Sequence, residues 1–233
     1  MTPSTPSAHD RRSGWPSAVL FDLDGTLVDS ERLWLDAIRS RLESIGAPSS
    51  SEALAGFEGL ATIDAARALC RVVGLSAHES LVAAELEDLT IGAFAGRLPW
   101  IPGAEEALGR LRREGMPLAL VTSSTRRWVD AVGESVHLGA FDAVVTADDV
   151  QHTKPHPEPY LRAAALLGVD PAACLVFEDS AVGVRAATAA GCRVVQVRSD
   201  DHDASRPTAR IPDLRAVTGP WVASLHADAP ALP

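Results

Sequence analysis

The feature that most constrains the fold is an alternation of short apolar runs with amphipathic helical stretches after residue 102. The apolar runs lack the period of two that marks half-exposed strands, and an earlier run of the same kind lies at 18–21. Continuous apolar strands alternating with helices are typical of a parallel sheet covered on both faces. The sequence therefore predicts an α/β fold with a doubly wound parallel sheet. The predicted strands are 18–21, 117–121, 143–145, 174–177 and 193–197, with a last one near Leu214 to Val217, and the predicted helices between them are 104–114, 125–136, 158–167 and 180–190.

A block with helical periodicity only separates the first strand from this alternating region. Over 30–45, Trp34, Ile38, Leu42 and Ile45 recur every three or four residues, which is typical of an amphipathic helix, and 61–73 and 76–95 repeat the period. The sequence thus predicts a catalytic core of 18–31 and 99–220 interrupted by an all-helical insert, 32–98. The flanking segments are predicted to be a disordered tail, 1–17, rich in Pro, Ser and Thr, and a C-terminal tail, 221–233.

Composition excludes several classes of protein. The chain has 31 acidic and 21 basic residues among 233, a formal charge of −10, so no basic surface for nucleic acid is expected. No apolar run approaches the roughly 18–20 residues of a membrane span, and the start does not resemble a signal peptide, which predicts a cytoplasmic protein. The three scattered cysteines predict buried thiols rather than disulfides or a zinc site. A monomer is the default expectation.

Residues of reactive types follow the predicted strands. Ligand sites in open α/β sheets form beyond the carboxyl ends of the strands, so these side chains are expected to meet at one edge. Each motif alone is also compatible with helix capping or turn formation. Four acidic groups in one cleft would, however, repel one another unless a cation held them together, and oxygen ligands suit Mg²⁺. The residues are Asp22 and Asp24, Thr122 and Ser123, Lys154, and Glu178 and Asp179.

A magnesium site of this kind predicts a phosphate substrate, because Mg²⁺ typically binds through one or two carboxylates plus phosphate oxygens. Lys154 would offer a positive charge to the phosphoryl oxygens. The Thr122 hydroxyl and the backbone N–H groups around Ser123 would donate hydrogen bonds to the same oxygens. Gly25 would free the turn and let the backbone pass close to the phosphate.

The spacing of two aspartates predicts the catalytic roles. Asp22 would attack phosphorus and form an acyl phosphate, which splits one difficult step into two. Asp24, two residues further on, would protonate the departing alkoxide and then activate water against the intermediate.

Four motifs in chain order resemble those of the haloacid dehalogenase superfamily. They are 21–30 (FDLDGTLVDS), 121–124 (VTSS), 154–155 (KP) and 177–180 (FEDS). The resemblance implies a Rossmann-like core, an aspartate nucleophile and a helical cap formed by the insert. It also implies Mg²⁺ bound by Asp22, the backbone carbonyl of Asp24 and Asp179, with Glu178 nearby. Superfamily members with Asp at the position of Asp24 are similar to phosphatases and phosphomutases rather than to dehalogenases.

Segments 146–150 and 154–160 look like those of small sugar-phosphate and polyol-phosphate phosphatases, and β-phosphoglucomutase is the nearest alternative. The mutase resemblance would require a basic pair near 57–62, where Glu58 and Thr62 stand, and a histidine where Trp34 stands. We therefore predict a Mg²⁺-dependent phosphomonoesterase acting on a small sugar phosphate or polyol phosphate.

Substrate specificity and non-catalytic alternatives are less constrained. Trp34, Glu58 and Arg126 are candidates for substrate selection, although Trp34 also fits the apolar stripe of its helix and Arg126 a solvated helix face. His152 and His156 flank Lys154 without a metal-ligand spacing and are interpreted as ordinary loop histidines. A phospho-accepting receiver domain fits poorly, because no helical insert interrupts that fold. A catalytically silent sugar-phosphate sensor is the alternative of another class.

Overall fold

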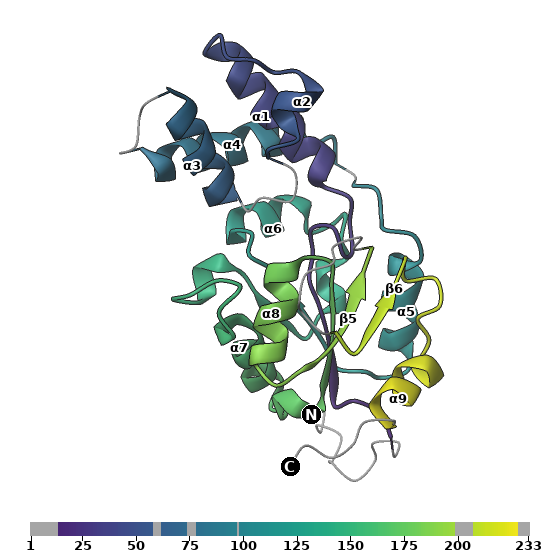
Figure 1. Cartoon of the computed structure of the whole chain (residues 1–233). Helices are drawn as coiled ribbons and strands as arrows, with labels where there is room; N and C mark the ends of the chain where they lie inside the picture. The colour runs from purple at the N-terminus through teal and green to yellow at the C-terminus, as the bar shows by residue number, and fades with distance from the viewer. Residues whose placement is uncertain (1–13, 58–61, 74–77, 97, 199–206, 228–233) are drawn as a thin grey trace, which may run out of the picture.

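A six-stranded, wholly parallel sheet forms the centre of the protein in the computed structural model, which describes residues 14–57, 62–73, 78–96, 98–198 and 207–227 (Figure 1). The strand order is β3-β2-β1-β4-β5-β6, so the chain winds outward in both directions from β1. The predicted α/β fold class is confirmed. The strands are β1 (Ala18–Phe21), β2 (Leu118–Val121), β3 (Ala143–Val145), β4 (Cys174–Glu178), β5 (Arg193–Val197) and β6 (Ala209–Ile211).

Helices cover both faces of the sheet, which explains why its central strands are apolar throughout. Val19 and Phe21 of β1 point to one face and Ala18 and Leu20 to the other, because successive strand residues alternate sides. The first face packs with α5 (Ala104–Arg113), α6 (Arg126–Val132) and α9 (Gly219–Ala227), the second with α7 (Glu158–Leu167) and α8 (Ala181–Ala189). Short 3-10 helices lie in the connections: η2 (Leu138–Ala140), η3 (Ala147–Asp149) and η4 (Pro171–Ala173).

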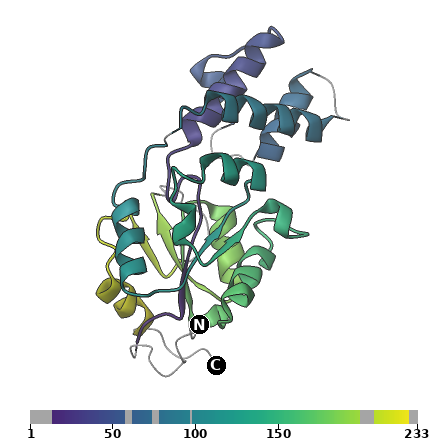
Figure 2. The same cartoon turned by 180° about the vertical axis from the view of Figure 1, so that it is seen from behind.

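Four helices form a separate group above the carboxyl ends of the strands, which we call the cap (Figures 1 and 2). They are α1 (Glu31–Ser44), α2 (Ser51–Leu54), α3 (Thr62–Val73) and α4 (Glu79–Ala93). The cap has its own apolar cluster, in which Ile38, Leu42, Leu69 and Leu86 are all buried. The short helix α2 was not predicted, whereas the other three match predicted helical stretches. The domain boundaries 32–98 stay a prediction.

The two chain segments that join the core to the cap run side by side. The backbone N–H of Asp29 donates to the Pro99 carbonyl at 2.8 Å, and that of Ile101 donates to the Leu27 carbonyl at 2.8 Å. Val28 and Trp100 form an antiparallel bridge between these two bonds. The cap is therefore anchored on a two-stranded hinge directly beside the end of β1.

The strand predicted near Leu214 to Val217 is wrong, because the sixth strand is Ala209–Ile211 and pairs with β5. Leu214 and Val217 are nevertheless fully buried. The Leu214 N–H donates to the Pro102 carbonyl at 2.9 Å, and the Arg110 guanidinium binds the Val217 carbonyl. Their apolar character reflects packing against α5 and its N-terminal turn rather than membership of the sheet.

Both predicted tails are partly wrong. Residues 219–227 form α9, in which Val222 is buried and the Trp221 ring stacks at 6.3 Å on Phe177 of β4. At the other end, Trp15 packs against the core and the Ser17 N–H donates to the Ala173 carbonyl at 2.7 Å. Residues 1–13 and 228–233 lie outside the described residues.

Two expectations from composition have structural counterparts. Cys70, Cys174 and Cys192 are buried free thiols, as predicted. Burial raises the pKa of Cys174 and of Cys192 to about 12, so both thiols stay protonated at neutral pH. Among the described helices, none combines the length and the apolar character needed to cross a membrane.

Ending the chain after Thr218 should destabilise the core, because it removes the buried Val222 and the Trp221 ring. Full burial of one such side chain contributes about 1.5–3 kcal/mol, so we expect the free energy of unfolding to fall by about 2–5 kcal/mol. Urea unfolding followed by circular dichroism measures the change. The matched control ends after Ala227 and keeps α9, and equal stability of the two truncated chains would contradict the assignment of α9 to the core.

Candidate active site

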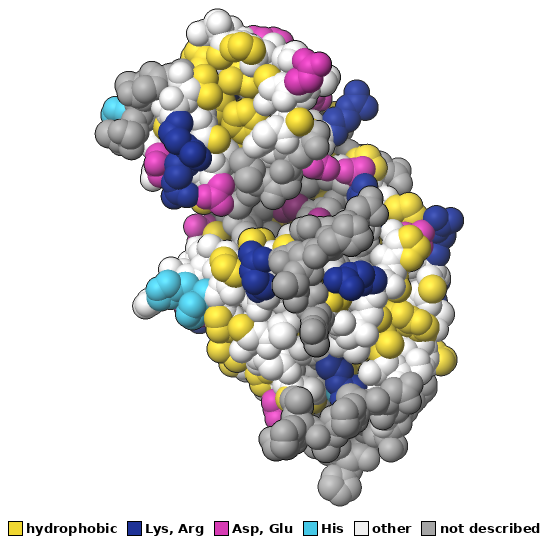
Figure 3. Space-filling view, in the orientation of Figure 1, with side chains coloured by type: hydrophobic (Ala, Val, Ile, Leu, Met, Phe, Trp, Pro, Cys, Tyr) yellow, Lys and Arg dark blue, Asp and Glu magenta, His cyan; other side chains and the backbone are white. Residues whose placement is uncertain are grey.

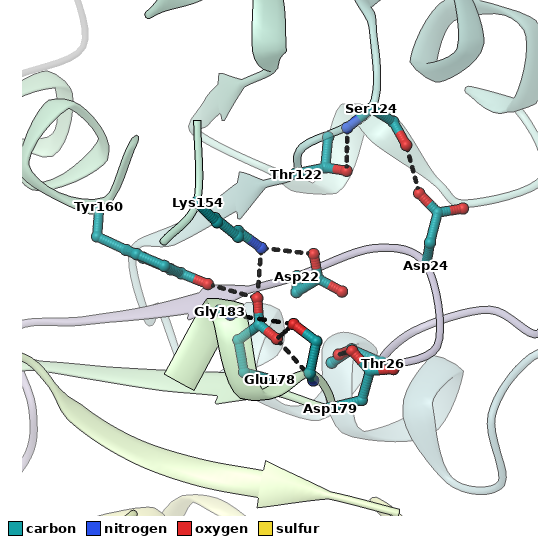
Figure 4. Close-up of polar contacts among 11 residues, drawn as sticks. Asp22, Asp24, Thr26, Thr122, Ser124, Lys154, Tyr160, Glu178, Asp179 and Gly183 are labelled. Carbon is teal, nitrogen blue, oxygen red and sulfur yellow. Dashed lines mark hydrogen bonds and ion pairs between the residues drawn. The ribbon is translucent and has the colours of Figure 1, made fainter. Parts of the chain in front are cut away.

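Side chains from three separate segments meet at the carboxyl edge of the sheet (Figure 4). Asp22 follows β1, Lys154 lies between η3 and α7, and Glu178 and Asp179 end β4. One carboxylate oxygen from each of the three acids lies within 4.8 Å of the others. The Lys154 Nζ is 2.7 Å from Asp22 Oδ1 and also donates to Glu178 Oε1. Residues up to 157 positions apart in the chain are thus brought into one cluster, the carboxylate cluster.

Lys154 is the only lysine in the chain, since the other 20 basic residues are arginines. Its side chain is 3% exposed, and burial alone would lower the pKa of its ammonium group. The carboxylates of Asp22 and Glu178 outweigh burial and hold that pKa above its usual value, so Lys154 is charged. A compact ammonium fits between two buried carboxylates where a planar guanidinium would need more room.

Glu178 is fixed by its own surroundings. Its Oε1 accepts from Lys154 and from the Tyr160 hydroxyl at 2.9 Å, and its Oε2 accepts from the Ser180 N–H and Oγ, both at 3.0 Å. A Cβ at Gly183 would lie 1.8 Å from Glu178 Oε1, so only a glycine at this position lets the first turn of α8 lie this close to the Glu178 carboxylate. Because both oxygens of Glu178 already have donors, the geometry favours a role in holding Lys154 over one as a direct metal ligand.

Asp22 and Asp179 have the properties of metal ligands. Asp22 Oδ2 is buried and has no hydrogen-bond partner among the described residues. Burial raises the pKa of Asp22 to about 7 despite the nearby Lys154, and burial together with Asp22 raises the pKa of Asp179 well above its usual value. Buried carboxylates in this state gain a proton or a cation. Their oxygens fit a hard divalent cation such as Mg²⁺.

Gly25 lies where the turn after β1 meets the Asp179 carboxylate. Its φ is +87°, and a Cβ there would lie 2.0 Å from Asp179 Oδ2. The turn after β1 therefore presses against the Asp179 carboxylate, which Thr26 Oγ1 also contacts at 3.3 Å. The glycine is required by this close approach.

Asp24 points away from the carboxylate cluster (Figure 4). Its Oδ1 accepts from Ser30 Oγ at 2.5 Å and from Trp128 Nε1 at 3.1 Å, and its Oδ2 accepts from Ser124 Oγ at 2.7 Å. With its side chain so engaged, Asp24 can offer a metal in this cluster only its backbone carbonyl. The sequence analysis missed these three partners. The sequence feature that could have indicated these donors is the run Thr122-Ser123-Ser124, which Trp128 follows about one helical turn later.

Trp128 connects Asp24 to the cap. Its indole is fully buried, and the rings of Trp34 on α1 and Phe94 after α4 lie against it, with centroid distances of 5.5 and 6.3 Å. Trp34, a candidate for substrate selection, thus packs at the contact between core and cap. Cap and core also meet where Thr125 Oγ1 donates to Glu87 of α4.

The other candidate residues are placed as follows. Thr122 is 2% exposed, and its Oγ1 accepts the Ser124 N–H at 3.0 Å, which leaves its hydroxyl hydrogen to donate elsewhere. Ser123 is half-buried beside it. Arg126 binds Asp149 at 2.6 Å, on the side of β3, so its guanidinium is already paired. Glu58 lies outside the described residues.

Comparisons with known proteins show the family to which the chain belongs. The family model for haloacid dehalogenase-like hydrolases matches residues 16–191. The chain belongs to this family. It is 37% identical over 187 residues to hexitol phosphatase A of Escherichia coli, covering 77% of this chain and 82% of the relative. It is 31% identical over 223 residues to the protein CbbY of Rhodobacter capsulatus, covering 85% and 94%.

A solved β-phosphoglucomutase from Clostridium difficile shares the fold, with a TM-score of 0.78 over 91% of this chain and 97% of the other, at 18% identity. The predicted membership of the family and the predicted phosphatase class are confirmed by the family match and by relatives that carry phosphatase names.

Replacing Lys154 by methionine should strongly destabilise the fold, because it leaves Asp22 and Glu178 buried without their cation. Removing one partner of a buried ion pair typically costs about 3–5 kcal/mol, and we expect this loss in urea unfolding at pH 8. Adding Glu178→Gln to Lys154→Met should recover part of it. A loss below about 1 kcal/mol, or a double variant no more stable than the single one, would contradict this account.

Proposed function

We propose that the chain is a Mg²⁺-dependent phosphomonoesterase that hydrolyses a small sugar phosphate or polyol phosphate through an aspartyl phosphate at Asp22. One observation carries the proposal: Asp22 lies in the same cluster as Asp179, with one carboxylate oxygen held by Lys154 and the other buried without a partner among the described residues. A carboxylate in that setting is positioned for a cation and a phosphoryl group rather than for structural hydrogen bonding.

In the first step an oxygen of Asp22 attacks phosphorus, and the bond to the ester oxygen breaks. The leaving alkoxide takes a proton from Asp24. In the second step Asp24 removes a proton from water, the water oxygen attacks the acyl phosphate, and Asp22 is released with inorganic phosphate. Asp22, Asp179 and the Asp24 carbonyl would hold Mg²⁺, which would reduce the repulsion between the anionic carboxylate and the anionic ester.

The remaining residues of the site would bind the phosphoryl group. Lys154 carries a fixed charge beside Asp22, and the Thr122 hydroxyl has a hydrogen to donate. The backbone around Ser123 adds N–H donors. Gly25 would let the backbone of the turn pass close to the phosphate, and its neighbour within the protein is the Asp179 carboxylate.

Asp24 must leave its present partners to act as acid and base. Its carboxylate accepts from Ser30, Ser124 and Trp128, and Trp128 packs against aromatic rings of the cap. We propose that movement of the cap over a bound substrate loosens this arrangement, so that Asp24 turns toward the leaving group when water is excluded.

The substrate class rests on the relatives, whose names include hexitol phosphatase A. We retain the predictions of a monomer in the cytoplasm with no nucleic-acid or membrane partner. A β-phosphoglucomutase-like phosphomutase and a silent sensor are the alternatives that the following experiments distinguish.

Asp22→Asn should abolish turnover of p-nitrophenyl phosphate, because the amide neither attacks phosphorus nor holds Mg²⁺ as a carboxylate does. Asp24→Asn should release about one equivalent of p-nitrophenolate in a burst and then stop, since that leaving group needs no acid but hydrolysis of the intermediate needs a base. Stopped-flow absorbance measures both. A burst from Asp22→Asn would reassign the nucleophile.

Protein stripped with EDTA should release no phosphate from a panel of sugar and polyol phosphates, and Mg²⁺ should restore release, because Asp22 and Asp179 would regain their cation. We expect phosphate from at least one member at a rate above that with p-nitrophenyl phosphate. Isomerisation of a hexose phosphate without phosphate release would favour the mutase. Binding without any turnover would favour the sensor.

A further inference from the structure

A second group of potential metal ligands lies on the loop that carries Lys154. His152 and His156 are exposed on this loop, between η3 and α7, and Glu158 begins α7. A histidine patch projects there from the core, at the left of Figure 3. One ligand atom from each of the three residues lies within 4.8 Å of the others. The spacing in the sequence did not suggest this convergence, because it depends on the path of the loop.

The contacts within the group hold it together. His152 Nδ1 is 3.1 Å from Glu158 Oε2. His156 Nδ1 is 3.9 Å from the same oxygen and accepts the Glu158 backbone N–H at 3.2 Å, which leaves its Nε2 as the nitrogen for a metal. The two imidazole rings face each other with centroids 4.6 Å apart. The Glu158 carboxylate is fixed by the backbone N–H groups of Gln151 and His152, at 2.8 and 3.0 Å. These hydrogen bonds hold the pKa of Glu158 below its usual value, and the bond from Gln151 has the largest effect. The carboxylate is therefore ionised.

The two groups of potential metal ligands found among the described residues differ in chemistry. Asp22 and Asp179 offer only oxygen atoms, which suit Mg²⁺. The loop group offers two imidazole nitrogens and one carboxylate oxygen, which suit Zn²⁺, Cu²⁺ or Ni²⁺, and its exposure leaves positions open to water.

We propose that His152, His156 and Glu158 form a second metal site, which binds one divalent transition-metal ion of the zinc and copper class on the outer side of the Lys154 loop. The ion would bridge the two sides of the loop, since Lys154 lies between the two histidines in sequence. Its side chain points instead to Asp22 and Glu178. An ion at this site would therefore stabilise the loop that presents the ammonium group, without contacting the carboxylate cluster.

Zinc binding measured by isothermal titration tests the proposal. The full-length protein is first saturated with Mg²⁺, so that the carboxylate cluster does not take the titrated ion. We expect the wild-type protein to bind one more equivalent of Zn²⁺ than the double variant His152→Ala/His156→Ala. Glu158→Gln should weaken this binding about 10-fold or more, since loss of an outer-shell partner alone typically weakens metal binding 10–100-fold.

The matched control is His137→Ala. His137 is another exposed histidine with a carboxylate neighbour, its Nε2 lying 2.9 Å from Glu105 Oε1. This variant should bind Zn²⁺ as the wild type does. That result would show that a single exposed His–Glu pair does not account for the Zn²⁺ binding assigned to the loop site. Circular dichroism and a cooperative thermal transition show that each variant is folded.

Electron paramagnetic resonance with one equivalent of Cu²⁺ gives an independent readout. We expect hyperfine coupling to two imidazole nitrogens in the wild type and its loss in the double variant. Zn²⁺ should also raise the melting temperature of the wild type and not that of the double variant. Three results would each overturn the proposal. They are an equal Zn²⁺ stoichiometry in the wild type and the double variant, unchanged Cu²⁺ hyperfine coupling in the double variant, and no binding to the wild type at about 0.1 mM Zn²⁺, an order-of-magnitude limit for a useful site.

Discussion

The contact between the Lys154 ammonium and the carboxylates of Asp22 and Glu178 is the interaction on which the site depends. The buried Asp22 and Glu178 and the half-buried Asp179, at the ends of β1 and β4, would repel one another without a positive charge among them. The charge comes from a loop outside those two strands. Glu178, with Tyr160 and Ser180 on its other sides, fixes the position of that charge. Asp22 then keeps one oxygen without a partner among the described residues.

Packing of the backbone against these carboxylates imposes a second constraint. Gly25 and Gly183 both lie where a Cβ would overlap a carboxylate, of Asp179 in one case and Glu178 in the other. Each acid is therefore confined by the main chain of a neighbouring turn, which limits its rotamers. The sequence predicted the turn at Gly25 but not its contact with Asp179, because a neighbour across the sheet edge is invisible in a single sequence.

The parallel sheet and the meeting of Asp22, Lys154 and Asp179 could be predicted, because strand hydrophobicity and the strand ends are local features and parallel topology aligns those ends. Other features depend on distant partners. The mixed residues of β6 form a strand only because β5 offers an edge, and Leu214 is apolar because it lies under α5. The convergence of His152 with Glu158 likewise follows from the path of a loop rather than from a periodic pattern.

The position of Asp24 links the chemistry to the cap. Its carboxylate has three donors, and one of them, Trp128, is buried under Trp34 of the first cap helix. A carboxylate held by three donors stays turned away from the carboxylate cluster, whereas an acid catalyst must reach the leaving group to donate its proton. The two requirements are compatible only if Asp24 exchanges its surroundings during the reaction. The cap contacts at Trp128 provide the physical route by which closure over a substrate would bring about that exchange.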